Sequence, residues 1–140
     1  MLPLEHIGIA VKSLSESVPL FEKLFGTDCY KTELVESEQV NTAFFKAGET
    51  KVELLESIRP DGVISRFIDK KGEGIHHLAF AVDNIETAMT TMKEKGFILL
   101  NEVPKKGADN KLICFLHPKS TNGILIELCQ DIKEKASPTL

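Results

Sequence analysis

The sequence predicts an α+β fold in which two tandem βαβββ modules form a curved, partly closed, eight-stranded mixed sheet around a cavity, with the helices outside. The first observation is a repeat, because the segment Leu4–Val11 recurs as Gly74–Val82 with a histidine followed by small residues in both copies. The second is that a capped amphipathic helix and three β-prone runs follow each copy. One strand pattern therefore opens two similar halves.

The repeated strand has two unlike faces. Side chains alternate along a strand, so each histidine shares its face with small residues, while bulky apolar residues occupy the other face. The first face holds His6, Gly8 and Ala10 in one copy and His77, Ala79 and Ala81 in the other. A bulky face favours a covering helix, and a face of small residues leaves room for a ligand.

A helix is predicted directly after each repeated strand. Ser13 to Glu16 reads as a capping box, and an apolar stripe follows it as far as Gly26. Asp83 to Glu86 begins the second helix, which Gly96 ends. The stripes are Leu14, Val18, Phe21, Leu24 and Phe25, then Ile85, Ala88, Met89 and Met92. Pro19 predicts a ragged first turn, since a proline inside a helix costs roughly 3 kcal/mol.

Three strands are predicted after each helix. They cover residues 30–35, 41–47 and 50–56 in the first half, and residues 97–101, 111–117 and 123–129 in the second. Between the halves, Pro60–Gly62 precedes a short helix with Val63, Ile64, Phe67 and Ile68 facing inward. We therefore expect one domain over residues 1–130. It comprises module one (1–58), a linker helix (59–72) and module two (73–130), and a loosely ordered tail follows at 131–140.

Composition excludes several classes of protein. The net charge is -4 with a pI near 5.6, and no basic stripe is present, so nucleic acid is not expected as a partner. No apolar run approaches the ~20 residues of a membrane span, so no membrane partner is expected. Three cysteines without motif spacing, and no secretory signal, predict reduced thiols and a cytoplasmic location. Cys114 and Cys129 lie in predicted strands as buried small hydrophobes.

Four residues form the candidate site. The last strands of the two halves contain Glu53 and Glu127, each between apolar neighbours, and the repeated strands contain His6 and His77. A carboxylate buried alone is unfavourable, so each glutamate calls for a partner such as a cation. Two imidazoles and two carboxylates suit a divalent transition metal, and the repeat relates one pair to the other.

Other histidines compete for the role. A lone histidine or glutamate in a strand is more often structural, and only the coincidence across the two copies favours ligation. His76 occupies the repeat position of Glu5 and is predicted to share its face with bulky Leu78 and Phe80, so His77 is preferred. His117 ends a strand without a counterpart in the first half, and we interpret it as a loop anchor or a substrate-side residue.

These residues resemble the vicinal oxygen chelate superfamily over residues 4–130. The second half is the more specific part and resembles the methylmalonyl-CoA epimerases. Its matching segments are 74–83 (GIHHLAFAVD), 104–108 (PKKGA), 115–120 (FLHPKS) and 123–128 (GILIEL). Lactoylglutathione lyases, extradiol dioxygenases and antibiotic-resistance proteins share the superfamily but not this series of motifs.

The resemblance implies roles for the candidate residues. It places the family's metal ligands on His6, Glu53, His77 and Glu127, with one divalent ion per subunit (Co, Mn, Ni or Zn). It implies proton abstraction at C2 of a methylmalonyl thioester through a metal-stabilised enolate, with Glu127 and Glu53 as the catalytic acid and base pair. Some bacterial members have a further glutamate, proposed as a base, where this chain has Thr42.

The resemblance also implies the setting of the reaction. It predicts an isomerase that binds an acyl-CoA thioester, forms a homodimer and acts beside a cobalamin-dependent mutase in propionate or succinate metabolism. Lys105, Lys106 and Lys119 are candidates for contact with the CoA phosphates, because lysines gather in these loops of the second half. Two alternatives remain: a lactoylglutathione lyase (glyoxalase I) type of isomerase, and a metal-free binding module of the bleomycin-resistance kind.

Overall fold

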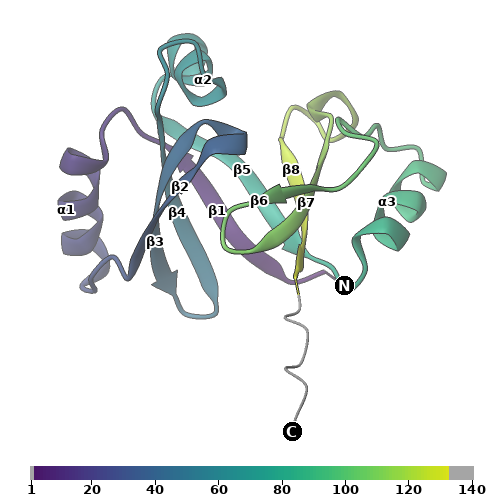
Figure 1. Ribbon diagram of the computed structural model, residues 1–140, viewed down its shortest axis with the longest axis horizontal. Helices are drawn as coiled ribbons and strands as arrows, with labels where there is room; N and C mark the ends of the chain where they lie inside the picture. Colours follow the sequence, from purple (N-terminus) through teal and green to yellow (C-terminus); the bar gives the residue numbers. More distant parts are fainter. Residues whose placement is uncertain (1, 133–140) are drawn as a thin grey trace, which may run out of the picture.

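The computed structural model describes residues 2–132 as a single eight-stranded mixed sheet with three α-helices (Figure 1). The strands are β1 (Leu4–Ala10), β2 (Lys31–Val35), β3 (Val40–Ala47), β4 (Thr50–Ser57), β5 (Gly74–Ala81), β6 (Lys105–Gly107), β7 (Lys111–Leu116) and β8 (Ile126–Asp131). The helices are α1 (Leu14–Phe25), α2 (Val63–Lys71) and α3 (Ile85–Glu94), with 3₁₀ turns η1 (Glu36–Glu38) and η2 (Pro118–Ser120).

Strand order confirms the two βαβββ modules. The order is β2-β3-β4-β1-β5-β8-β7-β6, so the two repeated strands lie side by side at the centre. Within each module the repeated strand runs parallel to the last strand, as β1 does with β4 and β5 with β8. The modules meet where β1 pairs antiparallel with β5. This antiparallel seam gives the molecule its approximate twofold symmetry.

Helices α1 and α3 cover the outer faces, on opposite sides of the molecule (Figure 1). Beneath α1 lie Val11, Phe45 and Leu54, and beneath α3 lie Cys114 and Leu128. The bulky faces predicted from the sequence are therefore the helix-covered ones. Helix α2 instead lies over one end of the sheet, where Ile64 is buried and Val63 is half exposed.

Both helices begin close to their predicted positions. The Ser13 hydroxyl accepts the Glu16 amide, as the capping box requires. In α3 the cap is Asn84, which accepts the Thr87 amide, and not Asp83 as the pattern indicates. The ragged first turn expected from Pro19 is wrong, because the first turn of α1 is intact, with the Ser17 amide bonded to the Ser13 carbonyl. The assignment of Leu24 to the buried stripe is also wrong, because its side chain is exposed.

The strand predicted at 97–101 is wrong. This segment makes one isolated bridge, Leu99 to Leu116, and the edge strand of module two is β6 instead. The reason lies in Asn101, whose side chain donates to the Ile113 carbonyl and accepts the Phe115 amide. Because the Asn101 side chain occupies these two backbone groups of β7, the backbone of the 97–101 segment cannot pair with them, and no regular strand forms.

Side chains close the sheet where no strand pairing does. Asp109, in the turn between β6 and β7, accepts Lys31 Nζ at 2.5 Å and Lys51 Nζ at 2.7 Å, and its amide donates to Glu33 Oε1 at 3.0 Å. Near the same edge, Lys105 Nζ lies 2.9 Å from Glu38 Oε1. Ion pairs therefore link module two to module one on the side of the sheet away from the seam.

Three smaller expectations concern the whole chain. Cys114 and Cys129 are buried and unpaired, as predicted. No helix among residues 2–132 combines the length and apolar character needed to cross a bilayer. The predicted loose tail lies outside the described residues from position 133 onward, whereas Asp131 is still part of β8.

Candidate active site and metal centre

One cavity lies on the inner face of the sheet and is closed at one end by α2. It spans about 540 Å³, part of which is open to solvent. Val35, Leu55, Ile64 and Ile113 give it apolar walls, and polar side chains gather in one part of it. The polar lining residues are His6, Glu38, Thr42, Glu53, His76, His77 and Glu127. All four sequence-predicted ligands thus reach the same cavity.

Strand register explains why the four predicted ligands reach the same cavity. Across the seam, His6 pairs with Ala79 and His77 pairs with Gly8, so each histidine lies opposite a small residue. In the parallel pairs, Gly8 lies beside Glu53 and Ala79 lies beside Glu127. Each glutamate is therefore next to the small residue that faces the other module's histidine. The twofold relation brings both pairs to the middle of the sheet.

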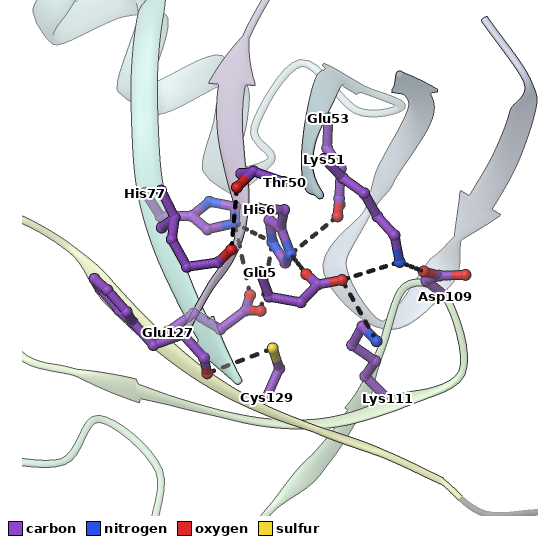
Figure 2. Close-up of polar contacts among 12 residues, drawn as sticks. Glu5, His6, Thr50, Lys51, Glu53, His77, Asp109, Lys111, Glu127 and Cys129 are labelled. Carbon is purple, nitrogen blue, oxygen red and sulfur yellow. Dashed lines mark hydrogen bonds and ion pairs between the residues drawn. The ribbon is translucent and has the colours of Figure 1, made fainter. Parts of the chain in front are cut away.

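The ligand atoms are close enough to share one ion. His6 Nε2 lies 3.0 Å from His77 Nε2 and 3.5 Å from Glu127 Oε2, and His77 Nε2 lies 3.6 Å from Glu127 Oε1 (Figure 2). Donor atoms of these three residues all lie within 4.8 Å of one another. Glu53 Oε2 approaches the other edge of the same ring, 3.1 Å from His6 Nδ1. The two carboxylates therefore flank His6.

Gly8 is required where it stands. A Cβ built on this residue would lie 2.2 Å from Cε1 of His77, well inside van der Waals contact. The imidazole of His77 occupies the volume that any other residue at position 8 would fill. The small face predicted from the sequence is thus the space that admits the second histidine.

Burial makes the charges of this cluster interdependent. His6, Glu53, His77 and Glu127 are each at most 5% exposed. Burial raises the pKa of Glu53 to about 7 and that of Glu127 to about 8 in the protein alone. Burial would lower the pKa of His6, but hydrogen bonding to Glu5 and the nearby carboxylates raise it to about 9. Burial holds the pKa of His77 well below its usual value.

This donor set fits a divalent transition metal. Two imidazole nitrogens and the Glu127 carboxylate converge, and the Glu53 carboxylate lies on the other side of the His6 ring. Such buried acids are stabilised as anions by a cation, and mixed nitrogen and oxygen ligands suit Zn²⁺, Mn²⁺, Co²⁺ or Ni²⁺. His6, His77 and Glu127 would hold the ion, whereas the predicted fourth ligand, Glu53, lies on the Nδ1 side of His6 and outside this three-residue cluster.

Thr42 is an unusual neighbour of the ligands. Its side chain is fully buried on β3 and lines the cavity, and its hydroxyl has no hydrogen-bond partner among the described residues. Buried hydroxyls nearly always have a partner. A ligand in this cavity would supply the partner that the hydroxyl lacks.

The other sequence candidates differ in their distance from the cavity. Lys105 is near its mouth, since Nζ pairs with Glu38 and lies 5.5 Å from the centre of the Phe115 ring. Lys106 and Lys119 are exposed and do not line the cavity. His117 caps η2, where its Nδ1 accepts the Lys119 amide, so it is a loop anchor.

Sequence reasoning missed two residues of the site. Glu5 accepts a hydrogen bond from His6 Nδ1, and His76 reaches the cavity although strand alternation assigned it to the opposite face. The face assigned to His76 is therefore wrong. A signal was present, because the repeat aligns Glu5 with His76 and both can hydrogen bond to the histidine that follows.

Known proteins show the same fold and sequence pattern. Residues 5–115 match the family model described as the Glyoxalase/Bleomycin resistance protein/Dioxygenase superfamily. The uncharacterized protein YqjC of Bacillus subtilis is 39% identical over 91% of this chain and 91% of its own. The mitochondrial methylmalonyl-CoA epimerase of Dictyostelium discoideum is 37% identical, over 89% of this chain and 76% of its own.

A solved structure extends the comparison. A variant of the Streptomyces coelicolor methylmalonyl-CoA epimerase with one glutamate changed to glutamine, in complex with 2-nitronate-propionyl-CoA, is 32% identical with a TM-score of 0.88, over 93% of this chain and 97% of that chain. The expected superfamily is thus confirmed. The chain belongs to the glyoxalase/bleomycin resistance protein/dioxygenase superfamily and, within it, to the family of the methylmalonyl-CoA epimerases.

Proposed function

We propose that this protein interconverts (2R)- and (2S)-methylmalonyl-CoA and that the reaction depends on a divalent metal. The observation that carries the proposal is the convergence of His6, His77 and Glu127, with Glu53 beside them, in a buried cavity of a chain related to epimerases. The reaction exchanges one proton at C2 and needs no redox cofactor. A buried pair of carboxylates beside a cation suits that chemistry.

The residues of the site would give the substrate a bound cation on one side and apolar walls around it. His6, His77 and Glu127 would hold the ion, with Glu53 able to join them. A bound divalent ion would act as a Lewis acid toward the thioester oxygen and the free carboxylate of the substrate. The apolar walls formed by Leu55, Ile64 and Ile113 would limit the contact of water with the reacting carbon.

Two carboxylates on different sides of the site can serve the two faces of the substrate. One takes the C2 proton as the C–H bond breaks, and the electron pair moves into the thioester to give an enolate. The other, initially protonated, returns a proton to the opposite face. Glu53 and Glu127 fit these roles because they flank the ring of His6, at Nδ1 and Nε2 respectively. Exchange with solvent then resets both groups.

Thr42 cannot replace a carboxylate in this scheme, because a hydroxyl near neutral pH does not abstract a carbon-bound proton unaided. We assign it to substrate contact, where its unpaired hydroxyl would donate to an oxygen of the methylmalonyl group. Lys105, at the cavity mouth, would meet the phosphates of CoA. The expected homodimer and cytoplasmic location stay predictions, and sedimentation of the purified protein tests the first.

The test is deuterium exchange at C2 of methylmalonyl-CoA in D₂O, with chelated protein and with Co²⁺, Mn²⁺, Ni²⁺ or Zn²⁺ restored. The proposal expects exchange and epimerisation that a chelator abolishes and a metal restores. The hemithioacetal of glutathione and methylglyoxal is assayed beside it as the comparison substrate. Turnover of that compound alone would indicate a glyoxalase I type of isomerase. Protein purified without chelator that holds no metal and turns over neither compound would indicate a binding module.

A further inference from the structure

Each central strand contains a β-bulge directly before its ligand histidine. On β1, Leu4 pairs with Phe80 and His6 with Ala79, so Glu5 is an extra residue without a partner on β5. On β5, His77 pairs with Gly8 and Ile75 with Ile9, so His76 is extra in the same way. Bulges turn a side chain away from the alternation of the strand and concentrate beside active sites. The repeat places the two bulges at equivalent positions.

Each extra residue contacts Nδ1 of the histidine that follows it. The carboxylate of Glu5 accepts a hydrogen bond from His6 Nδ1, and His76 Nδ1 lies 2.9 Å from His77 Nδ1. Neighbours in a regular strand point to opposite faces, so neither contact could form without the bulge. Meanwhile Nε2 of His6 and Nε2 of His77 face one another at 3.0 Å. The contacts on Nδ1 thus orient Nε2 toward the cavity.

Both extra residues are themselves held in place. Glu5 Oε1 lies 3.0 Å from Lys51 Nζ and 3.5 Å from Lys111 Nζ, and Lys51 continues to Asp109 at 2.7 Å (Figure 2). His76 packs edge-on against Phe67 of α2, with ring centres 5.0 Å apart. Glu5 is therefore fixed by charge and His76 by packing.

A cation bound to Nε2 of both rings determines where their protons lie. A neutral imidazole has one N–H, so each ring must carry it on Nδ1 when Nε2 is a ligand. Nδ1 then needs an acceptor, and metal-bound histidines usually donate this proton to a carboxylate or another acceptor. Glu5 is the acceptor for His6. With Nδ1 of His6 satisfied, Glu53 is free to turn from that ring toward the ion.

We infer that Glu5 and His76 are positioning residues, which the paired bulges place to hold Nδ1 of His6 and His77 so that both Nε2 atoms face one divalent cation. The inference rests on the metal dependence proposed above. It adds two residues to the site and predicts that they contribute unequally to metal affinity. Glu5 is a carboxylate anchored by two lysines, so it contributes more to affinity than the imidazole of His76.

The test is Co²⁺ affinity, measured by competition with a chelator, together with the visible absorption of bound Co²⁺. Glu5→Leu and His76→Leu remove the acceptors. We expect losses of affinity within the ~10–100-fold range typical of such partners, with Glu5→Leu near the upper end, and a changed absorption spectrum. His76→Asn keeps an acceptor near the position of Nδ1 and should recover most of the affinity. Glu5→Gln, which keeps the size and an acceptor but loses the charge, should be intermediate.

A matched control is Glu49→Gln, which removes the same charge from the exposed turn between β3 and β4. It should bind Co²⁺ as the unmodified protein does. Wild-type affinity and spectrum in both leucine variants would overturn the inference, whatever their activity. Unmodified protein that binds Co²⁺ but exchanges no C2 proton would instead overturn the proposed reaction, and weakened Co²⁺ binding in the leucine variants would still support the positioning role.

Discussion

Module one holds its ligand histidine with a carboxylate, whereas module two holds the equivalent histidine with a second imidazole. The backbone device is the same in both, an extra residue in the strand just before the histidine. The side chains that use it have diverged. The comparison shows that the two halves share the backbone bulge, whereas the side chain that each bulge presents to its histidine differs.

The glutamates differ in a related manner. Glu127 of module two belongs to the compact cluster with both histidines, whereas Glu53 of module one approaches only the Nδ1 edge of His6. Their neighbours across the sheet also differ, since Gly8 lies beside Glu53 and Ala79 beside Glu127. Module two thus supplies two members of the three-residue cluster, and module one supplies the third together with a carboxylate that lies beside the cluster. Four predictions test this difference.

The largest effect is expected at Gly8. Gly8→Ala puts a methyl group 2.2 Å from Cε1 of His77, so the ring must leave its place. Co²⁺ affinity should fall by more than the ~100-fold that loss of an outer hydrogen bond costs. The control is the repeat-equivalent change Ala79→Gly, which should keep Co²⁺ and lose roughly 1 kcal/mol of stability through chain entropy. Equal Co²⁺ affinity in the two variants would show that the position of the His77 ring does not depend on the space at residue 8.

The glutamates are separated by isotope exchange. If each serves one face of the enolate, Glu53→Gln should stop net epimerisation but still wash deuterium into one epimer, and Glu127→Gln should do so with the other epimer. Glu127→Gln should also lose more metal, because Glu127 lies within the three-residue cluster. Metal content is measured on the same samples. A metal-loaded Glu53→Gln that epimerises at the wild-type rate would leave Glu53 as a ligand at most and would direct attention to Glu38.

A smaller effect is expected at the cavity mouth. Lys105→Met should raise KM for the CoA thioester roughly fivefold with little change in kcat, and the effect should shrink as salt is added. Lys119→Met should change KM less, since Lys119 does not line the cavity. Lys95→Met, at the C-terminal end of α3, serves as the charge-matched control. A fall in kcat with KM unchanged would place Lys105 at the reacting carbon.

The smallest effect concerns the charged closure between the modules. Burial alone would raise the pKa of Asp109, but hydrogen bonds from Lys31 and Lys51 lower it. Its stabilisation is therefore present above the unfolded-state pKa of about 3.9 and is lost as the pH falls through the lower, folded-state value. Asp109→Asn should cost about 1 kcal/mol in urea unfolding at about pH 7 and clearly less at about pH 3, where part of this stabilisation has been lost.

Two features make this prediction specific. Asp109 has a φ of 59°, a left-handed conformation that asparagine also tolerates, so the substitution removes charge without backbone strain. Asp61→Asn removes one partner of the exposed pair with Arg59 and should leave the unfolding free energy unchanged at both pH values. A loss for Asp109→Asn that does not vary with pH would mean that the ion pairs contribute nothing to closure.

The sequence predicted what depends on periodicity and repetition. The two-module fold followed from the echo of His6 at His77, and the helices followed from local caps such as Ser13. It did not predict features that depend on pairing. Glu5 and His76 reach the site through bulges, which need two strands in register, and strict alternation pointed the wrong way. The segment at 97–101 has strand-like residues, but it makes only an isolated bridge, and beyond Leu100 the side chain of Asn101, not the backbone, bonds to Ile113 and Phe115.

The central position of β1 determines when the molecule can assemble. β1 is synthesised before either of its partners, β4 at Thr50–Ser57 and β5 at Gly74–Ala81. At ~5–20 residues per second, a ribosome takes roughly 4–15 s to go from β1 to the end of β5. Until β4 has been synthesised, neither edge of β1 has its partner, and the edge that pairs with β5 stays open until the end of that interval. Completion of β5 is therefore the step after which the seam between the two modules can form.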